Sequence, residues 1–301
     1  MKSIAIIIPY YGQWPSWIDL FFVSCKNNDT IDFHFFTDLS IPDVASNERN
    51  IRFHQISFVD YCTYASRQLG TDFHPVNPYK LCDLRPFYGF IHQNILKDYD
   101  FWGYGDIDLI WGNIRHFYND KILSMHDILS THADRFSGHL TLVHNLSYIN
   151  NRAFDIPNWQ SLLIDNKNYA LDEQHFTLQF YPTVRFLWKI HRHIYFRFKF
   201  KDEWKSYNSF CKVFNKLFGP RRLYLVEQYT TPWFTEYETD SIVHWTYRNG
   251  MINESITGKE LIYLHFLSLK THWCNKYLHI SAPFDDITIT LKGIFDTKAI
   301  N

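Results

Sequence analysis

Short runs of consecutive apolar residues alternate with a helical pattern along the first third of the chain. The runs at residues 4–8, 33–36 and 51–54 predict strands, the first of them buried on both faces. Residues 17–25, between the first two runs, have the apolar spacing of a helix. Strand, helix and strand in this order predict a parallel sheet with right-handed crossovers, whose ligands bind at the carboxyl ends of the strands. We therefore expect an α/β fold with its site at that edge of the sheet.

The alternation continues further along the chain. Residues 86–96 and 171–180 have helical spacing. Residues 100–109 and 138–144 are typical of strands, and the first of these leads into a turn at 111–112. We find no internal repeat and no low-complexity linker. The pattern therefore predicts a single domain over residues 1–301, with a mostly parallel sheet flanked by helices.

Residues 185–222 differ in composition from the rest of the chain. Aromatic and Ile side chains alternate there with Arg and Lys. One interpretation is a helix or hairpin that packs on the core with a solvated basic edge. The other is attachment to an anionic membrane surface, because basic and aromatic side chains together favour lipid headgroups. The sequence favours neither, so a peripheral membrane contact through this segment is kept as a prediction.

The charge balance excludes one class of partner. The chain has 30 Lys and Arg against 31 Asp and Glu, which gives a net charge of −1 at pH 7. Bulk binding to nucleic acid needs a net basic face that displaces phosphate counterions, so we expect no nucleic-acid partner. Aromatic residues make up 19% of the chain, which predicts that some of them meet a sugar, a base or a lipid headgroup at the surface.

Cysteine usage and apolar run lengths predict the compartment. The five cysteines are widely spaced and form no C-x-x-C pair, which is typical of a reducing compartment without a disulfide or zinc framework. No run approaches the roughly 20 apolar residues that cross a bilayer. The apolar start is cut by Pro9 and lacks a small-residue cleavage site, so it is interpreted as a strand. We expect a cytoplasmic protein, peripheral at most on the inner face of the cytoplasmic membrane.

The clearest candidate for chemistry is the acidic pair within residues 102–112. Asp106 and Asp108 stand at i and i+2, so on an extended chain both carboxylates project to one side, and neighbouring glycines let a ligand approach closely. Carboxylate oxygens suit a hard divalent cation, Mg²⁺ or Mn²⁺, which would bridge two phosphates of a nucleotide. A bare D-x-D arises by chance in many chains. Here apolar neighbours bury it, and because unpaired buried carboxylates are costly, the pattern favours a metal.

Other segments surround this pair in a definite order. They are Pro9, Tyr10 and Tyr11 after the first strand; Thr37 and Asp38 after the second; Lys80, Asp83 and Arg85 within 79–86; Asp172 and Glu173 before Gln174; and His265 within 263–266, followed by Lys270. In this order the chain resembles the GT-A glycosyltransferases, most of all bacterial enzymes that build capsule, lipopolysaccharide or O-antigen sugar chains. The resemblance covers most of the sequence. It implies a nucleotide-binding half over residues 1–112 and an acceptor half over 113–301.

The resemblance also implies the ligands of these segments. The residues at the nucleotide would be Pro9, Tyr10, Tyr11, Thr37 and Asp38 for the base, Lys80, Asp83 and Arg85 for ribose and phosphate, and Lys270 for phosphate. His265 would complete the metal shell of Asp106 and Asp108. The donor would be a nucleotide-diphospho-sugar, with UDP preferred because the resembling enzymes mostly use it. The acceptor would be a hydroxyl of a glycan or a lipid-linked glycan.

The reacting centre is also implied by the resemblance. Glu173 would lie below the anomeric carbon with Asp172 beside it. For inversion Glu173 would deprotonate the acceptor hydroxyl, whereas for retention it would stabilise an oxocarbenium-like centre. The common inverting pattern has Glu before Asp, and the reverse order here leaves the base and the stereochemistry open. His139, next to Gly138 which permits close contact, is a candidate for contacting sugar hydroxyls.

Each motif also has an ordinary interpretation. Residues 9–11 could simply end a strand, residues 80–85 could form an ion network at a helix surface, and residues 172–173 could be first-turn acids of a helix. Two other functions stay open: a metal-dependent nucleotidyltransferase or phosphohydrolase, and a carbohydrate-binding protein without activity. The chain lacks the phosphate loop G-x-x-x-x-G-K-S/T, which disfavours the first of them.

Overall fold

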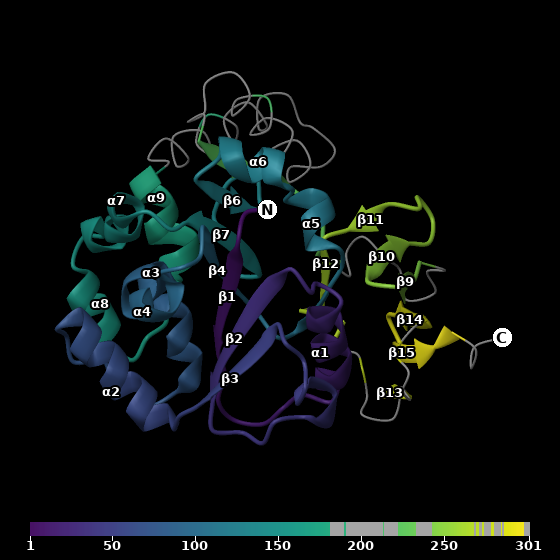
Figure 1. Ribbon diagram of the computed structural model, residues 1–301, viewed down its shortest axis with the longest axis horizontal. Coiled ribbons are helices and arrows are strands. Elements are labelled where there is room, and N and C mark those ends of the chain that lie inside the picture. The colour runs from purple at the N-terminus through teal and green to yellow at the C-terminus, as the bar shows by residue number, and fades with distance from the viewer. Residues whose placement is uncertain are drawn as a thin grey trace.

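The computed structural model describes residues 1–180, 190, 213, 222–232, 243–267, 269, 270, 273, 278, 279, 284 and 286–297. Its central feature is a seven-stranded sheet of order β3-β2-β1-β4-β7-β6-β8 (Figure 1). These strands are β1 (Ile4–Pro9), β2 (Ile31–Thr37), β3 (Ile51–Gln55), β4 (Phe101–Gly105), β6 (Ile128–Ser130), β7 (Leu140–His144) and β8 (Leu223–Leu225). Among these seven strands only β7 runs opposite to the others. The predicted α/β class with a mostly parallel sheet is confirmed.

The apolar run at the start of the chain forms the centre of this sheet. β1 pairs in parallel with β2 and β4, and its side chains alternate between two hydrophobic cores. Ala5 and Ile7 pack into one core, whereas Ile4, Ile6 and Ile8 pack into the other. A strand covered on both faces needs apolar side chains at every position, which is why the run is continuous.

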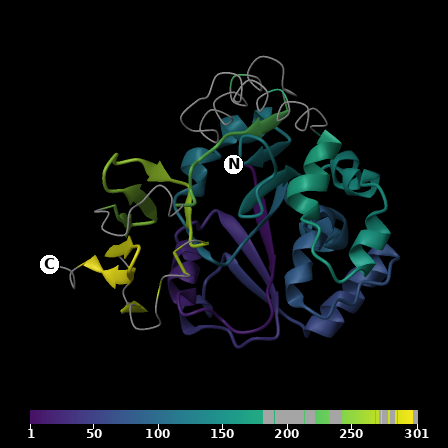
Figure 2. The same ribbon diagram turned by 180° about the vertical axis from the view of Figure 1, so that it is seen from behind.

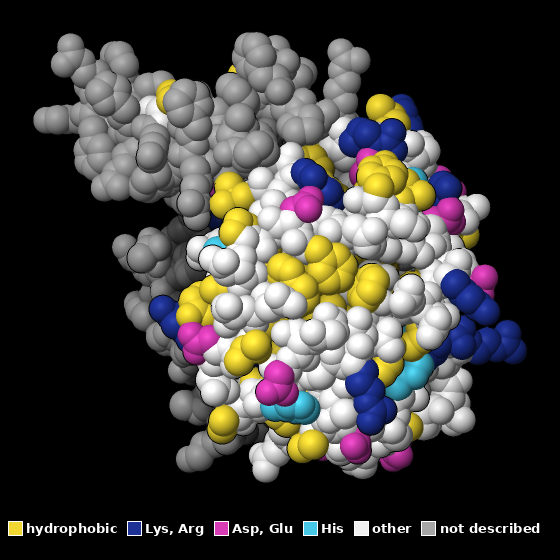
Figure 3. Space-filling view, turned by 90° about the vertical axis from the view of Figure 1, so that its left-hand side faces the viewer, with side chains coloured by type: hydrophobic (Ala, Val, Ile, Leu, Met, Phe, Trp, Pro, Cys, Tyr) yellow, Lys and Arg dark blue, Asp and Glu magenta, His cyan; other side chains and the backbone are white. Residues whose placement is uncertain are grey.

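Helices cover both faces of the sheet, as Figures 1 and 2 show. One face is covered by α1 (Ile18–Lys26) and α5 (Ile114–Phe117), and α6 (Asp120–Met125) follows α5. The other face is covered by α2 (Phe58–Leu69), α3 (Tyr88–Ile91), α4 (Gln93–Leu96), α7 (Ser147–Asn150), α8 (Trp159–Ile164) and α9 (Thr177–Phe180). Figure 3 looks onto this second group, where apolar side chains lie among polar and charged ones as on most protein surfaces.

The C-terminal part adds a second sheet beside α1. Its six strands have the order β11-β10-β9-β14-β15-β13. They are β9 (Trp245–Arg248), β10 (Met251–Glu254), β11 (Glu260–Leu261), β13 (Leu278–His279), β14 (Asp286–Thr290) and β15 (Gly293–Asp296). Between the two sheets β12 (Tyr263–His265) pairs antiparallel with β5 (Leu109–Trp111). This pairing brings residues 263–265 next to the acidic pair, which directly precedes β5.

Three predicted elements differ from the structure. The strand expected over 100–109 is divided into β4 and β5, because β4 pairs with β1 and β7 while β5 pairs with β12. The acidic pair lies in the bend between them and not on an extended strand. The helix expected over 86–96 is interrupted: a 3-10 helix η2 (Pro78–Phe87) precedes α3 and α4, which His92 separates with non-helical torsions.

The third difference concerns the helix expected over 171–180. Its first part is a π-helix, η4 (Leu171–Phe176), which follows Ala170 at φ 50° and continues into α9. Two short 3-10 helices, η1 (Asp43–Ala45) and η3 (Asn151–Asp155), complete the described elements. π-helical turns are rare and occur often at functional sites, which draws attention to the two acids that η4 carries.

Two predictions concern the membrane. Within the described residues, no helix combines the length and apolar character needed to cross a membrane. Apart from residues 190, 213 and 222, the basic aromatic segment 185–222 lies outside the described residues. The predicted peripheral contact through this segment therefore stays a prediction.

Candidate active site

A cleft of about 880 Å³ opens at the carboxyl ends of β1 and β4. Its walls come from segments far apart in the sequence: the turn after β1, η2, the bend 106–108, the loop before β7, η4, and the segment that begins in β12. The predicted site residues that line it are Pro9, Tyr10, Tyr11, Arg85, Asp106, Asp108, Gly138, His139, Asp172, Glu173, His265 and Lys270. The site thus lies at the sheet edge where the strand order places ligands.

Arg85 joins two carboxylates of the cleft. Its guanidinium forms an ion pair with Asp106 and donates to Asp172 over 2.9 Å between Nη1 and Oδ2. Burial raises the pKa of Asp172 to about 6, although Arg85 opposes this rise. Burial also raises the pKa of Asp106 in spite of the same guanidinium. Both carboxyls are thus more readily protonated than exposed carboxyls, and a second cation beside Asp106 would stabilise its charged form.

Asp108 has a different set of neighbours. Lys270 Nζ lies 2.5 Å from its Oδ2, and His265 Nε2 lies 3.3 Å from its Oδ1. The pKa of Asp108 is lowered, because hydrogen bonds and charge from His265 and Lys270 outweigh burial. The backbone strengthens this connection, since Phe266 N donates to Asp108 O over 2.7 Å. The chain itself therefore supplies positive charge to each member of the acidic pair.

Asp106 also belongs to a group of metal-ligating side chains. Asp106, His139 and His265 each offer one ligand atom, and these atoms lie within 4.8 Å of one another. Burial, with His265 next to it, holds the pKa of His139 well below its ordinary value, so this imidazole is neutral. A carboxylate oxygen and imidazole nitrogens are ligands of divalent transition ions, and the residues present therefore fit a divalent cation.

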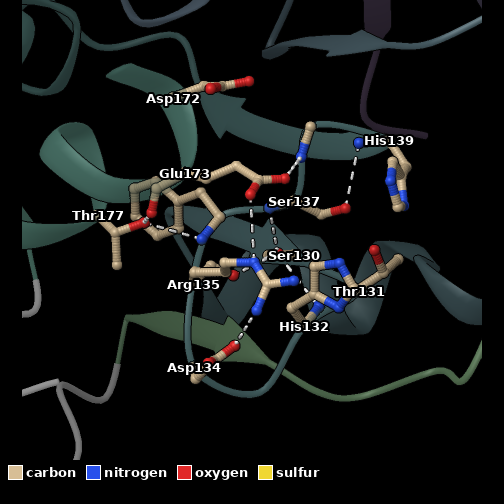
Figure 4. Close-up of polar contacts among 12 residues, drawn as sticks. Ser130, Thr131, His132, Asp134, Arg135, Ser137, His139, Asp172, Glu173 and Thr177 are labelled. Carbon is tan, nitrogen blue, oxygen red and sulfur yellow. Dashed lines mark hydrogen bonds and ion pairs between the residues drawn. The ribbon is translucent and has the colours of Figure 1, made fainter. Parts of the chain in front are cut away.

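Glu173 lines the cleft, and Figure 4 shows its carboxylate facing Arg135. Its Oε1 accepts from Gly138 N at 3.2 Å, and its Oε2 lies 3.4 Å from Arg135 Nε. A Cβ atom at Gly138 would lie 2.8 Å from Arg85 Nη1 and 3.2 Å from Glu173 Oε1, so only glycine fits here without displacing both side chains. Figure 4 shows Asp172 apart from this group, so the two acids of η4 have separate partners.

The predicted base-binding residues are divided between the cleft and its surroundings. Tyr10 stacks on Trp14, with ring centroids 5.1 Å apart. Tyr11 is buried, and its hydroxyl has no hydrogen-bond partner among the described residues. Thr37 is buried, accepts from Leu39 N at 3.2 Å and does not line the cleft. Asp38 is exposed and is also outside the cleft lining.

Lys80 and Asp83 do not line the cleft either. Lys80 Nζ is buried and donates to Asp83 Oδ2 at 2.9 Å and to the carbonyl of Leu162 at 2.6 Å. Asp83 in turn accepts from Tyr169 N at 2.9 Å and from Leu171 N at 3.0 Å. With three residues per turn in η2, positions 80 and 83 share one face, and that face is turned away from the cleft. Their contacts fix the loop that leads into η4.

The structure adds contacts that the sequence did not indicate. Arg85 links η2 to both the bend 106–108 and η4, and Arg135 reaches Glu173. The pairing of His139 with His265, whose ring centroids are 3.7 Å apart, joins two residues that are 126 positions apart. No local spacing signals such a pair, because it depends on the pairing of β12 with β5.

Comparisons with known proteins place the chain in a family. Among solved structures, the galactosyltransferase LgtC in complex with donor and acceptor sugar analogues is similar, with 16% identity and a TM-score of 0.35, covering 57% of this chain and 71% of that chain. An active-site mutant of LgtC gives 14% identity, the same TM-score and the same coverage. The curated proteins contain no match. A family model, described as a family of unknown function, matches residues 6–298. The chain therefore belongs to this family, DUF6625.

Proposed function

We propose that the protein is a glycosyltransferase that moves a hexose from a nucleotide-diphospho-sugar, preferably a UDP-sugar, to a hydroxyl of a growing bacterial surface glycan. The observation that carries this proposal is the position of Asp106 and Asp108. Both line one cleft at the carboxyl edge of the sheet, together with the cations Arg85 and Lys270. The sequence resemblance to GT-A glycosyltransferases supports the same function.

Charge in the cleft suits a diphosphate. Asp106, Asp108 and His265 would hold a divalent cation, which supplies positive charge that stabilises a departing diphosphate. Lys270 would lie near the diphosphate, because its ammonium contacts Asp108, one of the residues that would hold the cation. With the Asp108 carboxylate bound to a cation, the Lys270 ammonium would be available to pair with a phosphate oxygen. The aromatic side chains of Tyr10 and Tyr11 line the cleft, where they would contact the nucleoside.

The two acids of η4 are suited to different tasks. A general base works best when its pKa lies near the working pH, and burial raises the pKa of Asp172 to about 6. This supports Asp172 as the group that accepts the proton of the acceptor hydroxyl. Glu173 is held by Gly138 N and Arg135, which supports a role in orienting the sugar. The assignment differs from the sequence interpretation, which placed Glu173 at the anomeric carbon.

Nucleotide release tests the proposal. Purified protein is incubated with radiolabelled UDP-hexoses and MnCl₂, and the products are separated by chromatography. A glycosyltransferase releases UDP slowly even without acceptor, and EDTA stops the release. Formation of UMP or of a sugar phosphate would indicate a phosphohydrolase or nucleotidyltransferase instead. Binding without any cleavage would indicate a carbohydrate-binding protein, and either result would refute the proposed function.

A further inference from the structure

His139 lies where a cation in this cleft would bind. Its ligand atom and those of Asp106 and His265 are all within 4.8 Å of one another. A point central to three atoms that are at most 4.8 Å apart lies within about 2.8 Å of each, so each atom needs to move by less than about 1 Å to form a bond of about 2.1 Å to an ion there. The ligands come from three separate elements: the bend 106–108, the loop before β7, and β12. A site built by three elements is fixed by the fold.

A hydroxyl group orients each of the two imidazole rings. His139 Nδ1 lies 3.2 Å from the Tyr263 hydroxyl, which is itself 2.7 Å from Thr131 Oγ1. His265 Nδ1 lies 3.1 Å from Thr231 Oγ1. With Nδ1 engaged, Nε2 is the nitrogen of each ring that remains for an ion. Metal-bound histidines are usually held in this way, by a second group on the other ring nitrogen.

A contact with Asp108 shows that Nε2 of His265 is turned toward the acidic pair. His265 Nε2 lies 3.3 Å from Asp108 Oδ1, so this ring already faces the acidic pair. The ring of His139 lies against it, with centroids 3.7 Å apart. Two imidazoles and the Asp106 carboxylate therefore lie around one point in the cleft, and Asp108 borders this group through His265. Such a mixed set differs from an all-oxygen set in the ions that it prefers.

We propose that His139 is a direct ligand of the cation, and that the site consequently prefers Mn²⁺ or Co²⁺ to Mg²⁺. The inference rests on the proposed function, because it concerns the cation of the same cleft. Mg²⁺ takes oxygen ligands and gives up its water reluctantly, whereas first-row transition ions accept imidazole, Mn²⁺ more weakly than Co²⁺. A second imidazole thus raises the affinity for transition ions much more than the affinity for Mg²⁺.

Direct metal titration tests this inference without any turnover. CoCl₂, MnCl₂ and MgCl₂ are titrated separately into the full chain without nucleotide, with calorimetry for all three ions and visible absorption for Co²⁺. Removing even an outer-shell partner of a metal site typically costs 10- to 100-fold in affinity, so His139→Ala should weaken Co²⁺ and Mn²⁺ binding by at least about 10-fold. Mg²⁺ binding should change by less than about 3-fold, since Mg²⁺ gains little from imidazole.

Two more variants accompany His139→Ala. Tyr263→Phe keeps the ring of residue 263 but removes the hydroxyl next to His139 Nδ1, and it should weaken Co²⁺ binding by a smaller factor. This variant keeps the test valid if His139→Ala fails to fold. His116→Ala is the control, because His116 is an exposed histidine of α5 that does not line the cleft. Its Co²⁺ affinity and absorption should match those of the unchanged protein.

The outcomes separate the inference from the proposed function. If Asp106→Asn abolishes Co²⁺ binding while His139→Ala and Tyr263→Phe leave it unchanged, His139 is not a ligand, and the proposed function is unaffected. If the unchanged protein binds none of the three ions, the inference is also wrong. If His139→Ala weakens Co²⁺ binding as expected but UDP-hexoses are neither bound nor cleaved, His139 is a ligand and the proposed function fails.

Discussion

At the scale of single residues, the cleft balances its carboxylates with cations of the chain. Arg85 pairs with Asp106 and Asp172, and Lys270 pairs with Asp108. Carboxylates gathered at one place repel one another and favour protonation, so the partners decide which of them is charged at neutral pH. Asp108, with its lowered pKa, stays charged, whereas Asp172 with a pKa of about 6 titrates near the working pH.

As the proposed general base, Asp172 should control the pH dependence of turnover. A base must be deprotonated to accept a proton, so kcat/KM should rise with pH through about 6 and level off above it. Asp172→Asn should lower kcat by about 100-fold or more, which is typical of a lost general base, while the donor still binds. Glu173→Gln should lower kcat less. Steady-state kinetics of both variants from pH 5 to 8 tests this prediction. If Asp172→Asn is fully active and Glu173→Gln is inactive, Glu173 and not Asp172 is the general base.

At the scale of elements, a buried ion pair fixes the entry to η4. Lys80 and Asp83 have side chains that are 1% and 0% exposed, and Asp83 accepts the backbone N–H groups of Tyr169 and Leu171. The pair thus ties η2 to the residues directly before the two acids. Although Lys80 and Asp83 were predicted to contact the nucleotide, their contacts support the position of Asp172.

Removing one partner of this pair should be costly. Lys80→Met leaves the Asp83 carboxylate buried without its cation, which typically costs about 3–5 kcal/mol in the free energy of unfolding. Arg152→Met is the matched control, because Arg152 and Asp155 have the same i,i+3 spacing but are 45% and 52% exposed. An exposed pair contributes at most about 1 kcal/mol. Urea denaturation measures both, and similar small losses for the two variants would contradict a structural role for Lys80.

The strands were predictable because their pattern is local. A run of apolar residues such as 4–8 can bury all of its side chains only in a strand whose two faces are both covered, and β1 is such a strand. The division of 100–109 into β4 and β5 could not be read from the sequence, since it follows from pairing with β12 about 150 residues later. The irregular geometry of η2 and η4 likewise depends on tertiary contacts that override helical spacing.

The grouping of the candidate residues in one cleft was predictable only where a motif fixes their relative positions. Asp106 and Asp108 were predicted from their spacing and their apolar neighbours, and His265 and Lys270 from the resemblance to the GT-A glycosyltransferases; all four line one cleft. The sequence could not show that His139 lies against His265, or that Arg85 bridges two carboxylates. Such contacts depend on how separate loops meet, and side-chain spacing along the chain does not encode them.

At the scale of the whole molecule, a buried histidine pair lies on the sheet away from the cleft. His34 Nδ1 is 3.0 Å from His54 Nε2, and His34 Nε2 is 3.2 Å from the Tyr99 hydroxyl, which donates to Asp32. Burial lowers the pKa of His34 to about 4; the charge of His54 lowers it further, Asp32 opposes this, and Arg52 has a smaller lowering effect. The folded protein thus keeps His34 neutral where the unfolded chain, with a pKa near 6.5, becomes charged.

This difference should make the fold sensitive to mild acid. Between pH 6.5 and about 4 the unfolded chain binds a proton at His34 that the folded protein does not, so stability is complete above pH 6.5 and falls as pH decreases. The full effect of one such histidine is about 1.4 kcal/mol for each pH unit within this window. His34→Gln should lose less stability than the unchanged protein between pH 6.5 and 4.5. Equal losses in denaturation curves at the two pH values would contradict the assignment.

In the proposed function, Asp106 and Asp108 hold one cation that binds the diphosphate of the donor. Calorimetric titration of UDP into the protein with MnCl₂ tests it most directly, with Asp108→Ala and the exposed-site control Asp155→Ala measured alongside. We predict UDP binding that needs Mn²⁺, is lost with EDTA and weakens by at least about 100-fold in Asp108→Ala, equivalent to about 2.7 kcal/mol, while Asp155→Ala binds normally. UDP binding of equal strength in EDTA, or in a folded Asp108→Ala protein, would contradict the account.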